Sequence, residues 1–215
     1  MKIIYGTKNN GKVISMQKSL DKLKPDYDIE LIGLNQLNDV FPEVDEDGND
    51  PLENARKKAM AYYTIIKKPV FSLDSGLYFD GLPKHLQPEL NIRRVNGKRL
   101  NDAEMIYYYS QLAKDNGGRL IAKYVNGICL IMDDNLTFEH MGEDISTAKF
   151  IITTTPHPHI KHIEGFPLDS LSIHIASKKY FFDMQNEKFD KEDFFNIDHG
   201  FREFFTSALR VYSNK

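Results

Sequence analysis

The 215-residue sequence contains a single cysteine, Cys129. One cysteine excludes an internal disulfide framework and a zinc site built from several cysteines. Because Cys129 lies within the apolar run 128–132, we interpret it as a small core residue and not as a reactive thiol.

Long apolar runs are absent as well, and we expect no N-terminal signal peptide. No run approaches the roughly 20 apolar residues that a membrane-spanning helix needs. The opening MKIIYGTKNN is too short and too polar for a signal peptide. We therefore expect a soluble, cytoplasmic protein without a membrane partner.

The sequence also lacks an excess of positive charge. Its 28 Lys and Arg residues stand against 31 Asp and Glu, for a formal net charge of −3. The composition therefore gives no reason to expect a nucleic-acid partner. Apolar residues make up only 41%, but 14 Phe and 11 Tyr can build a core, and the length suits one α/β domain.

Apolar periodicity in the first half predicts short buried strands that alternate with helices. The strands are expected over residues 2–5, 28–34 and 69–73, with a helix after Gly6. The last of these strands would deliver the tripeptide 74–76 at its C-terminal end. A second helix should begin at a strong start signal, in which Asp50 caps, Pro51 takes the first helical position and Glu53 completes a capping box.

Beyond residue 100 the pattern changes from alternation to consecutive strands. Capping residues predict a helix from Asn101 to the glycine pair 117–118, and a final helix is expected from about residue 201. The strands are expected over residues 119–132, 136–141, 145–155 and 171–176. This order predicts a mixed α/β fold and not a strictly alternating one.

The segment 6–12 is a candidate phosphate-binding turn. Backbone N–H groups at a helix start, together with Lys12, favour phosphate oxygens. The spacing of Gly6, Gly11 and Lys12 also imitates a P-loop, but Val13 stands where that motif needs a hydroxyl for Mg²⁺. A P-loop NTPase and a plain turn with a solvated lysine therefore stay open as alternatives.

Three charged residues extend this candidate site. Glu46 lies in an acidic loop, Lys58 on the following helix and Asp74 after a strand. Two carboxylates at element ends can hold Mg²⁺ or activate water. Two lysines can neutralise a polyphosphate. Each residue also has an ordinary explanation: a solvated acid, a surface cation and a turn residue.

These residues belong to four ordered motifs that resemble the inosine triphosphate pyrophosphatase family, which clears deaminated purine nucleotides. The matching segments are T/S-x-N-x-x-K at 7–12, E-x-G followed by E-N-A-x-x-K-A within 46–59, D-S-G-L and its continuation at 73–82, and P-G-V-Y-S-A-R-Y-A-G at 88–97. Four motifs in this order are far more specific than any one of them.

The resemblance implies a fold and an assembly. It implies an α/β fold with a long central mixed β-sheet flanked by helices, and a single domain over residues 1–215 whose two lobes enclose a nucleotide cleft. The phosphate motifs would lie in a lobe of roughly 1–118 and the base-side motifs in a lobe of 119–215. Members of the family usually form homodimers, so we expect a homodimer.

The resemblance also implies residue roles. Asp74 and Lys12 would be catalytic, with Asp74 as the base or second metal ligand that readies water for attack at the α-phosphorus. Glu46 and Asp74 would hold Mg²⁺. The implied substrate contacts are Thr7, Asn9, Lys12, Lys58, Ser75, Arg94, Phe166, Asp169, His199 and Arg202. Arg94 has the alternative role of a structural ion-pair partner.

The base-side motifs depart from the family pattern. The family's G-F-G-Y-D-P is GFPLDS at 165–170, which keeps Phe166 for stacking and Asp169 for hydrogen bonds to a base. Leu73 also replaces the first residue of the family's acidic pair, and two residues are inserted within 84–87.

The family's S-H-R-x-R-A-L is DHGFREF at 198–204, which keeps His199 and Arg202. Gly200 replaces an arginine, and Phe194 stands where the family has a lysine. A base pocket that lacks these donors discriminates less well between bases.

The sequence therefore predicts Mg²⁺-dependent hydrolysis of non-standard purine nucleoside triphosphates (ITP, dITP and XTP) to the monophosphate and pyrophosphate. Such an activity cleans the nucleotide pool. The alternatives are a divergent family member that binds nucleotides without hydrolysis, and a P-loop NTPase built on residues 6–12.

Two further clusters are assigned no catalytic role. His157, His159 and His162 lie in a proline-containing segment that we interpret as a surface loop and not as a metal site. The tyrosines 107–109 are interpreted as packing or dimer-surface residues, with at least one directed toward the core.

Overall fold

The computed structural model describes residues 1–158, 166–184 and 196–214. The chain divides into two compact units, each assembled from separate chain segments. Unit 1 comprises Met1–Ser75, Val125–Ser146 and Asn196–Lys215, and unit 2 comprises Gly76–Tyr124 and Thr147–Phe195.

A mixed β-sheet flanked by helices organises the chain, as the sequence predicted. The hydrogen-bonded order in unit 1 is β2-β1-β3-β6-β7. Strand β1 runs parallel to β2 and β3, whereas β7 is antiparallel to β6. The strands are β1 (Lys2–Tyr5), β2 (Glu30–Gly33), β3 (Val70–Phe79), β6 (Arg119–Asp133) and β7 (Leu136–Met141).

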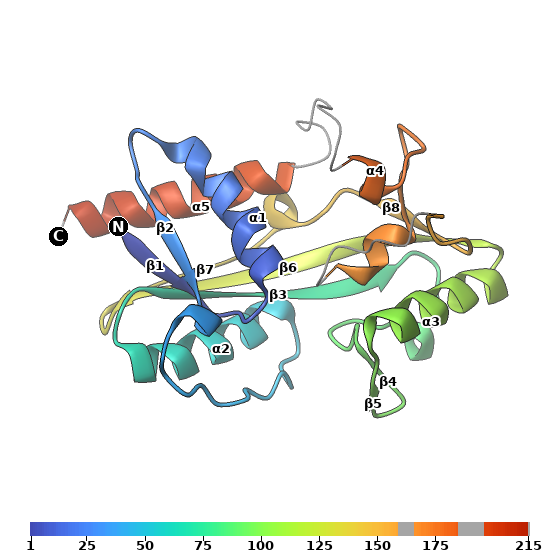
Figure 1. Ribbon diagram of the computed structural model, residues 1–215, viewed down its shortest axis with the longest axis horizontal. Helices are drawn as coiled ribbons and strands as arrows, with labels where there is room; N and C mark the ends of the chain where they lie inside the picture. The colour runs from blue at the N-terminus through green and yellow to red at the C-terminus, as the bar shows by residue number, and fades with distance from the viewer. Residues whose placement is uncertain (159–165, 185–195, 215) are drawn as a thin grey trace. The chain divides into compact units, whose positions relative to one another are not determined.

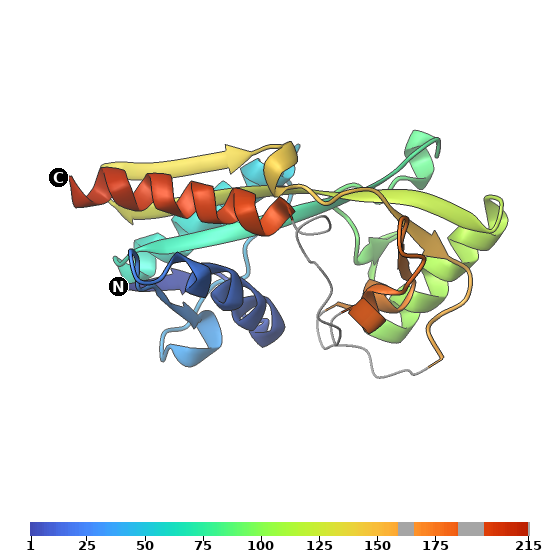
Figure 2. The ribbon, with the colours of Figure 1, turned by 90° about the horizontal axis from the view of Figure 1, so that it is seen from above.

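Alternation of side chains along these strands builds two cores in unit 1. Ile3, Tyr5 and Phe71 pack with helices α1 (Asn10–Leu20) and α5 (Asn196–Ser213). Their neighbours Ile4 and Val70 pack with α2 (Pro51–Ile66). Helices α1 and α5 therefore cover one face of this sheet and α2 the other (Figure 1). Seen from above, α5 lies along β6 and β7 (Figure 2).

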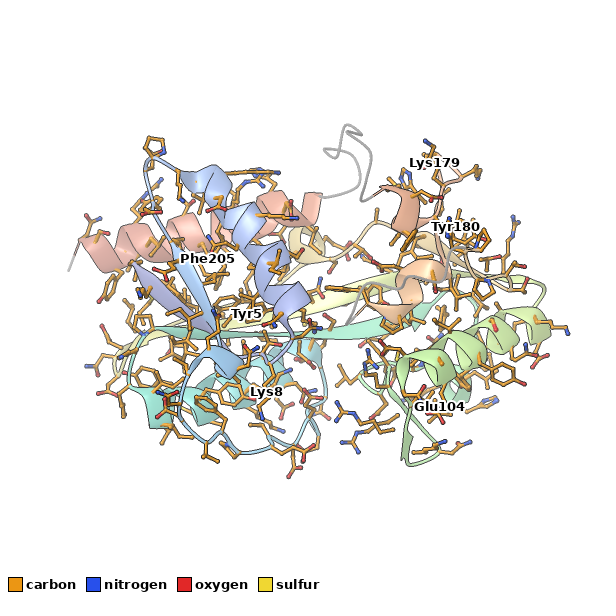
Figure 3. All side chains as sticks on the ribbon, viewed as in Figure 1. Tyr5, Lys8, Glu104, Lys179, Tyr180 and Phe205 are labelled. Carbon is orange, nitrogen blue, oxygen red and sulfur yellow. The ribbon has the colours of Figure 1, made fainter. Side chains whose placement is uncertain are left out.

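Three aromatic rings form the centre of the core beneath α1 and α5. The Phe71 ring stacks on Tyr5 with 4.3 Å between centroids and meets Phe205 edge-on at 5.1 Å. Tyr5 and Phe205, labelled in Figure 3, are both buried. Burial, followed by the charge of Asp74, raises the pKa of Tyr5 above its ordinary value.

Side-chain caps start two helices of unit 1, and the cap of α2 is the one that the sequence predicted. The Asn9 carboxamide caps α1 by accepting from the Lys12 amide at 3.2 Å. Asp50 caps α2 by accepting from the Glu53 amide at 2.8 Å. The predicted capping box of α2 is wrong, because the Glu53 carboxylate accepts from the Asn49 amide at 2.9 Å instead of turning back to Asp50.

Unit 2 continues β3 and β6 and adds two strands, in the order β3-β6-β8-β9. Tyr109 of α3 is fully buried against this sheet, and its hydroxyl donates to the Ile92 carbonyl at 2.8 Å. The predicted burial of one tyrosine of 107–109 is thus confirmed. The elements of unit 2 are α3 (Asp102–Asp115), β8 (Phe150–Thr153), β9 (Ser172–His174), α4 (Phe181–Met184) and the hairpin of β4 (Arg94–Val95) with β5 (Lys98–Arg99).

Short 3-10 helices connect these elements. They are η1 (Asp21–Leu23), η2 (Leu34–Gln36), η3 (Lys84–Leu86), η4 (Glu143–Ile145) and η5 (Pro167–Ser170). The strand expected over 145–155 is confirmed only for β8, because Ile145 belongs to η4 and residues 146–149 form neither helix nor strand.

Two other element bounds differ from the sequence prediction. Strand β3 does not end at residue 73 but continues through Asp74, Ser75 and Gly76 to Phe79. The polar tripeptide resembles a turn signal, yet it stays extended because β6 lies beside it as an equally continuous strand. The last helix is already formed at Asn196, and not first at about residue 201.

The prediction for Cys129 is confirmed, whereas the prediction for His157 is wrong. Cys129 is a buried core residue, as predicted, and burial followed by the charge of Glu139 raises the pKa of its thiol to about 12. The surface-loop prediction is wrong for His157. It is buried between the rings of Tyr180 and Phe182, and its Nε2 lies 3.0 Å from a carboxylate oxygen of Asp183.

His159 and His162 lie outside the described residues. Within the described ranges, no group of three His, Cys, Asp or Glu side chains is placed to hold a metal ion. The same ranges contain no helix of the length and apolar character needed to cross a membrane.

The burial of the Phe205 ring predicts that alanine variants of Phe205 and of its neighbour Phe204 differ strongly in stability. We expect Phe205→Ala to lower the free energy of unfolding by roughly 3–5 kcal/mol, because it empties a fully buried site. Phe204→Ala on the same helix should cost clearly less, because Phe204 is only partly buried. Urea unfolding followed by circular dichroism measures both, and equal losses would contradict this packing.

Candidate active site

Three charged side chains of unit 1 meet on the α2 face of β3. The Lys58 Nζ lies 2.6 Å from Asp74 Oδ1 and 3.0 Å from Glu46 Oε1, and it also donates to the Leu73 carbonyl at 3.4 Å. Helix α2 supplies the lysine, β3 supplies Asp74, and the acidic loop before α2 supplies Glu46. The structure therefore brings together three residues from two of the sequence motifs, with Glu46 and Lys58 in one and Asp74 in the other.

One side of this cluster is buried and the other is exposed to solvent. The Lys58 and Asp74 side chains are 11% and 15% exposed, whereas Glu46 is 53% exposed. Burial is the largest single influence on Lys58 and lowers its pKa, but the charges and hydrogen bonds of Asp74 and Glu46 together outweigh it. The net result is a raised pKa for Lys58, so its side chain is an ammonium ion at neutral pH.

A buried amide, which the sequence analysis did not assign, completes the contacts of Asp74. Asn54 Nδ2 donates to Asp74 Oδ2 at 3.0 Å, and Asn54 Oδ1 accepts from the Gly48 amide at 2.8 Å. Asn54 is 1% exposed. Its position one helical turn before Lys58, on the same face of α2, is the sequence signal that could have identified it.

A second amide of unit 1 contacts Ser75. The Ser75 hydroxyl donates to Asn126 Oδ1 at 2.6 Å, and Asn126 Nδ2 donates to the Ile145 carbonyl at 2.7 Å. Asn126 is buried at 4% exposure within β6. A polar residue inside the otherwise apolar stretch 125–132 of β6 was the available signal for it.

The candidate phosphate turn leaves the sheet beside β3. The parallel register pairs Tyr5 with Phe71, so Gly6 follows at the level of Ser72. A Cβ on Gly6 would lie 2.2 Å from Ser72 Oγ, and only glycine permits this approach. Because ligands of open α/β sheets bind beyond the carboxyl ends of parallel strands, the turn after β1 lies where such a site is expected. Asp74 lies inside β3, three residues beyond Phe71, the partner of the last β1 residue.

Local hydrogen bonds shape this turn. Thr7 Oγ1 accepts from the Asn9 amide at 3.2 Å, and Asn9 in turn caps α1 at Lys12. The turn residues Thr7, Asn9 and Lys12 thus form one group at the start of α1. Val13 is buried in the core, so it offers no ligand of the kind a P-loop needs.

The base-side candidates are divided between the two units. Arg94, in β4, is exposed. Its neighbour Arg93 forms an ion pair with Asp102 at 2.7 Å. Phe166 precedes η5 and Asp169 lies in it. These residues belong to unit 2.

His199 and Arg202 lie on α5 in unit 1. His199 is exposed, whereas Arg202 has a buried guanidinium nitrogen that makes no hydrogen bond within the described part of the chain. Between them, Gly200 packs so closely that a Cβ there would lie 2.2 Å from the Asp144 carbonyl oxygen. An arginine at this position would therefore displace α5 from η4. Gly165 and Phe194 lie outside the described residues.

The donor set of the Lys58 cluster suits a hard cation. Both carboxylates reach a single cationic atom, the Lys58 Nζ, and a backbone carbonyl lies beside it. Oxygen donors of this kind fit Mg²⁺, which commonly takes one or two carboxylates and completes its shell with water and phosphate oxygens. The residues present therefore fit such an ion, and Glu46 and Asp74 are the carboxylates that could hold it.

Fold and site together define an α/β protein with a candidate cation site on β3 and a candidate phosphate-binding turn at the carboxyl end of β1. The Ham1 family model matches residues 3–188. The chain therefore belongs to the Ham1 family.

Related sequences and structures agree with this membership. The dITP/XTP pyrophosphatase of Geobacter sulfurreducens is 35% identical over 101 residues, which cover 47% of each chain. That of Malacoplasma penetrans is 31% identical over 147 residues, covering 66% of this chain and 70% of the relative. The match to the Geobacter relative thus spans less than half of that protein's length.

Two solved structures share the fold. The Staphylococcus aureus Ham1 protein superposes with a TM-score of 0.66 at 22% identity, over 100% of both chains. A HAM1 protein from Coxiella burnetii gives 0.65 at 20% identity, over 99% of both chains. The mixed sheet flanked by helices is therefore the fold of Ham1 proteins.

Removal of the Lys58 charge should destabilise the fold, because the Glu46 and Asp74 carboxylates lose the cation that they share. We expect Lys58→Met to lower the free energy of unfolding by about 2 kcal/mol, somewhat less than for a fully buried pair because Glu46 is half exposed. Lys57→Met is the matched control, since Lys57 contacts Asp47 and Glu53 at the surface and should change stability little.

The stability difference between the wild type and Lys58→Met should depend on pH, because the pKa of Lys58 is raised. A raised pKa stabilises the fold below the unfolded value near 10.5, and the contribution is lost as pH rises through the folded pKa above it. The gap between wild type and Lys58→Met in urea unfolding should persist at neutral pH and narrow only above about pH 10.5. A gap that closes between pH 5 and 8 would contradict this assignment.

Proposed function

We propose that the protein hydrolyses non-standard purine nucleoside triphosphates (ITP, dITP and XTP) to the monophosphate and pyrophosphate, with Mg²⁺. The observation that carries the proposal is the Lys58 cluster, in which Glu46 and Asp74 share one cation beside the turn that opens α1. Membership of the Ham1 family, and relatives named dITP/XTP pyrophosphatases, support the substrate class.

The site residues of unit 1 bind the triphosphate and neutralise its charge. Asn9 and Lys12, with Thr7 shaping the turn, bind the triphosphate at the start of α1, where backbone N–H groups favour anions. Lys12 and Lys58 offset the charge that the triphosphate brings toward the carboxylates. Mg²⁺ held by Glu46 and Asp74 would supply further charge neutralisation on the phosphate oxygens.

Asp74 directs water at the α-phosphorus, either as the base or through its part in the metal site. A new P–O bond forms from water, the bond between the α-phosphorus and the bridging oxygen breaks, and pyrophosphate leaves with that oxygen. Ser75 helps to shape the phosphate pocket. Such chemistry depends mainly on positioning and charge neutralisation, which these residue types provide.

The base side of the proposal rests on four retained residues. Phe166 stacks on the purine, and Asp169, His199 and Arg202 offer it hydrogen bonds, with Arg94 as a further substrate contact. Gly200 removes one family donor, so we propose a weaker preference for 6-keto purines. The expected homodimer belongs to this proposal, and light scattering in solution measures it.

Product identity tests the proposal. The protein is incubated with Mg²⁺ and ITP, XTP, dITP, GTP, ATP or pyrimidine triphosphates, and phosphate is assayed with and without added inorganic pyrophosphatase. We expect phosphate only with the coupling enzyme, fastest for ITP or XTP but over a narrow range of rates among the purines. Phosphate without coupling would mean cleavage of the terminal bond and would favour the P-loop alternative.

The contacts of Asp74 favour a second candidate, a family member that binds nucleotides without hydrolysing them. Both carboxylate oxygens of Asp74 accept hydrogen bonds, and Leu73 offers no second acid beside it. Tight nucleotide binding with no product under any divalent metal would favour this candidate.

Asp74→Asn tests the catalytic assignment directly. Because the amide can neither accept a proton nor hold a cation well, we expect turnover to fall by roughly 10²–10⁴-fold with the fold retained. Asp80→Asn is the matched control, since Asp80 pairs with Lys149 at the surface and lies outside the site. Turnover near the wild-type rate in Asp74→Asn would show that another group activates the water.

A further inference from the structure

The acidic loop and β3 are joined by one buried side chain that has no assigned role. Asn54 bridges the Gly48 amide, two residues after Glu46, and the Asp74 carboxylate. We propose that Asn54 is a positioning residue that holds Glu46 and Asp74 at the separation needed for a shared cation. This inference rests on the proposed function, because that separation matters only if both carboxylates serve one site.

The partners of Asn54 determine the orientation of its amide. Its Nδ2 faces a carboxylate oxygen at 3.0 Å and its Oδ1 faces a backbone N–H at 2.8 Å. A flipped amide would set oxygen against oxygen and N–H against N–H. At 1% exposure, water cannot replace either partner, so the side chain is held in this one arrangement.

The glycine in the loop allows this contact. A Cβ on Gly48 would lie 2.6 Å from Asn54 Oδ1 and 3.0 Å from Glu53 Cβ. Any other residue would push the loop away from α2. The spacing of Glu46, Gly48 and Asn54 in one motif is therefore explained by a single approach of the loop to the helix.

Asn54 and Lys58 act on the same two segments from adjacent turns of α2. Asn54 holds Asp74 Oδ2 and the Gly48 amide, and Lys58 holds Asp74 Oδ1 and Glu46 Oε1. A substrate or metal ion that draws Lys58 away would leave only Asn54 between loop and strand among these contacts. Asn54 thus preserves the spacing of the carboxylates when the charge of Lys58 is engaged elsewhere.

Two variants of Asn54 separate its two hydrogen bonds. Asn54→Ala removes both, whereas Asn54→Asp keeps an acceptor for the Gly48 amide but sets a negative charge against Asp74. Asn49→Ala is the matched control, because Asn49 is an exposed asparagine of the same loop that contacts only Glu53 through its side chain.

The first readout is hydrogen exchange of the Gly48 amide by NMR, which requires neither metal nor nucleotide. We expect exchange to accelerate about tenfold in Asn54→Ala, as for the loss of one buried hydrogen bond, and to stay near wild type in Asn54→Asp and Asn49→Ala. Unchanged exchange in Asn54→Ala would overturn the proposed bridge.

The second readout is steady-state hydrolysis over a range of Mg²⁺ concentrations. Misplaced carboxylates should lower kcat by roughly 10²-fold and raise the Mg²⁺ needed for half-maximal rate in both Asn54 variants, with a smaller change in KM for the nucleotide. A folded Asn54→Asp variant with the wild-type rate and Mg²⁺ requirement would overturn the positioning role.

The two readouts distinguish this inference from the proposed function. If the wild type hydrolyses no triphosphate while Gly48 exchange accelerates in Asn54→Ala, the activity is wrong and the bridge between loop and strand is supported. If the wild type hydrolyses triphosphates and Asn54→Asp does so equally well, the activity stands and the positioning role is wrong.

Discussion

The ammonium group of Lys58 is the constraint on which the site depends, because it holds two carboxylates that would otherwise repel each other. Like charges held close together repel each other, and the ammonium group between Glu46 and Asp74 offsets that repulsion. Lys58 is carried there by α2, whose first turn packs against β6 at Gly127. A Cβ on Gly127 would lie 2.3 Å from the Leu52 amide nitrogen. The position of one helix on the sheet therefore sets the geometry of the cluster.

Local signals in the sequence predicted the helices and strands that carry the candidate site. Asp50 identified where α2 begins, because an N-cap is satisfied by residues two or three positions away. The continuation of β3 through Asp74 could not be predicted in this way, because it depends on β6, which lies far away in the sequence. The α/β class and the mixed sheet were predictable; strand ends that depend on distant partners were not.

The same distinction explains what was found and missed in the site. Glu46, Lys58 and Asp74 could be identified because a charged side chain can bind a metal ion or a phosphate whatever its neighbours are. The structure brings these three into contact. Asn54 and Asn126 were missed because a neutral amide has no chemistry of its own until its partners are known. The close contact of Gly200 with Asp144 was equally invisible, because it joins α5 to a segment about 55 residues earlier.

The central claim is that water attacks the α-phosphorus of a nucleoside triphosphate at the Glu46, Lys58 and Asp74 cluster. Hydrolysis of ITP in H₂¹⁸O, followed by mass spectrometry of both products, tests it most directly. The account predicts one ¹⁸O atom in the monophosphate and none in the pyrophosphate. Label in the pyrophosphate, or in orthophosphate released without a second enzyme, would place the attack at another phosphorus and contradict the account.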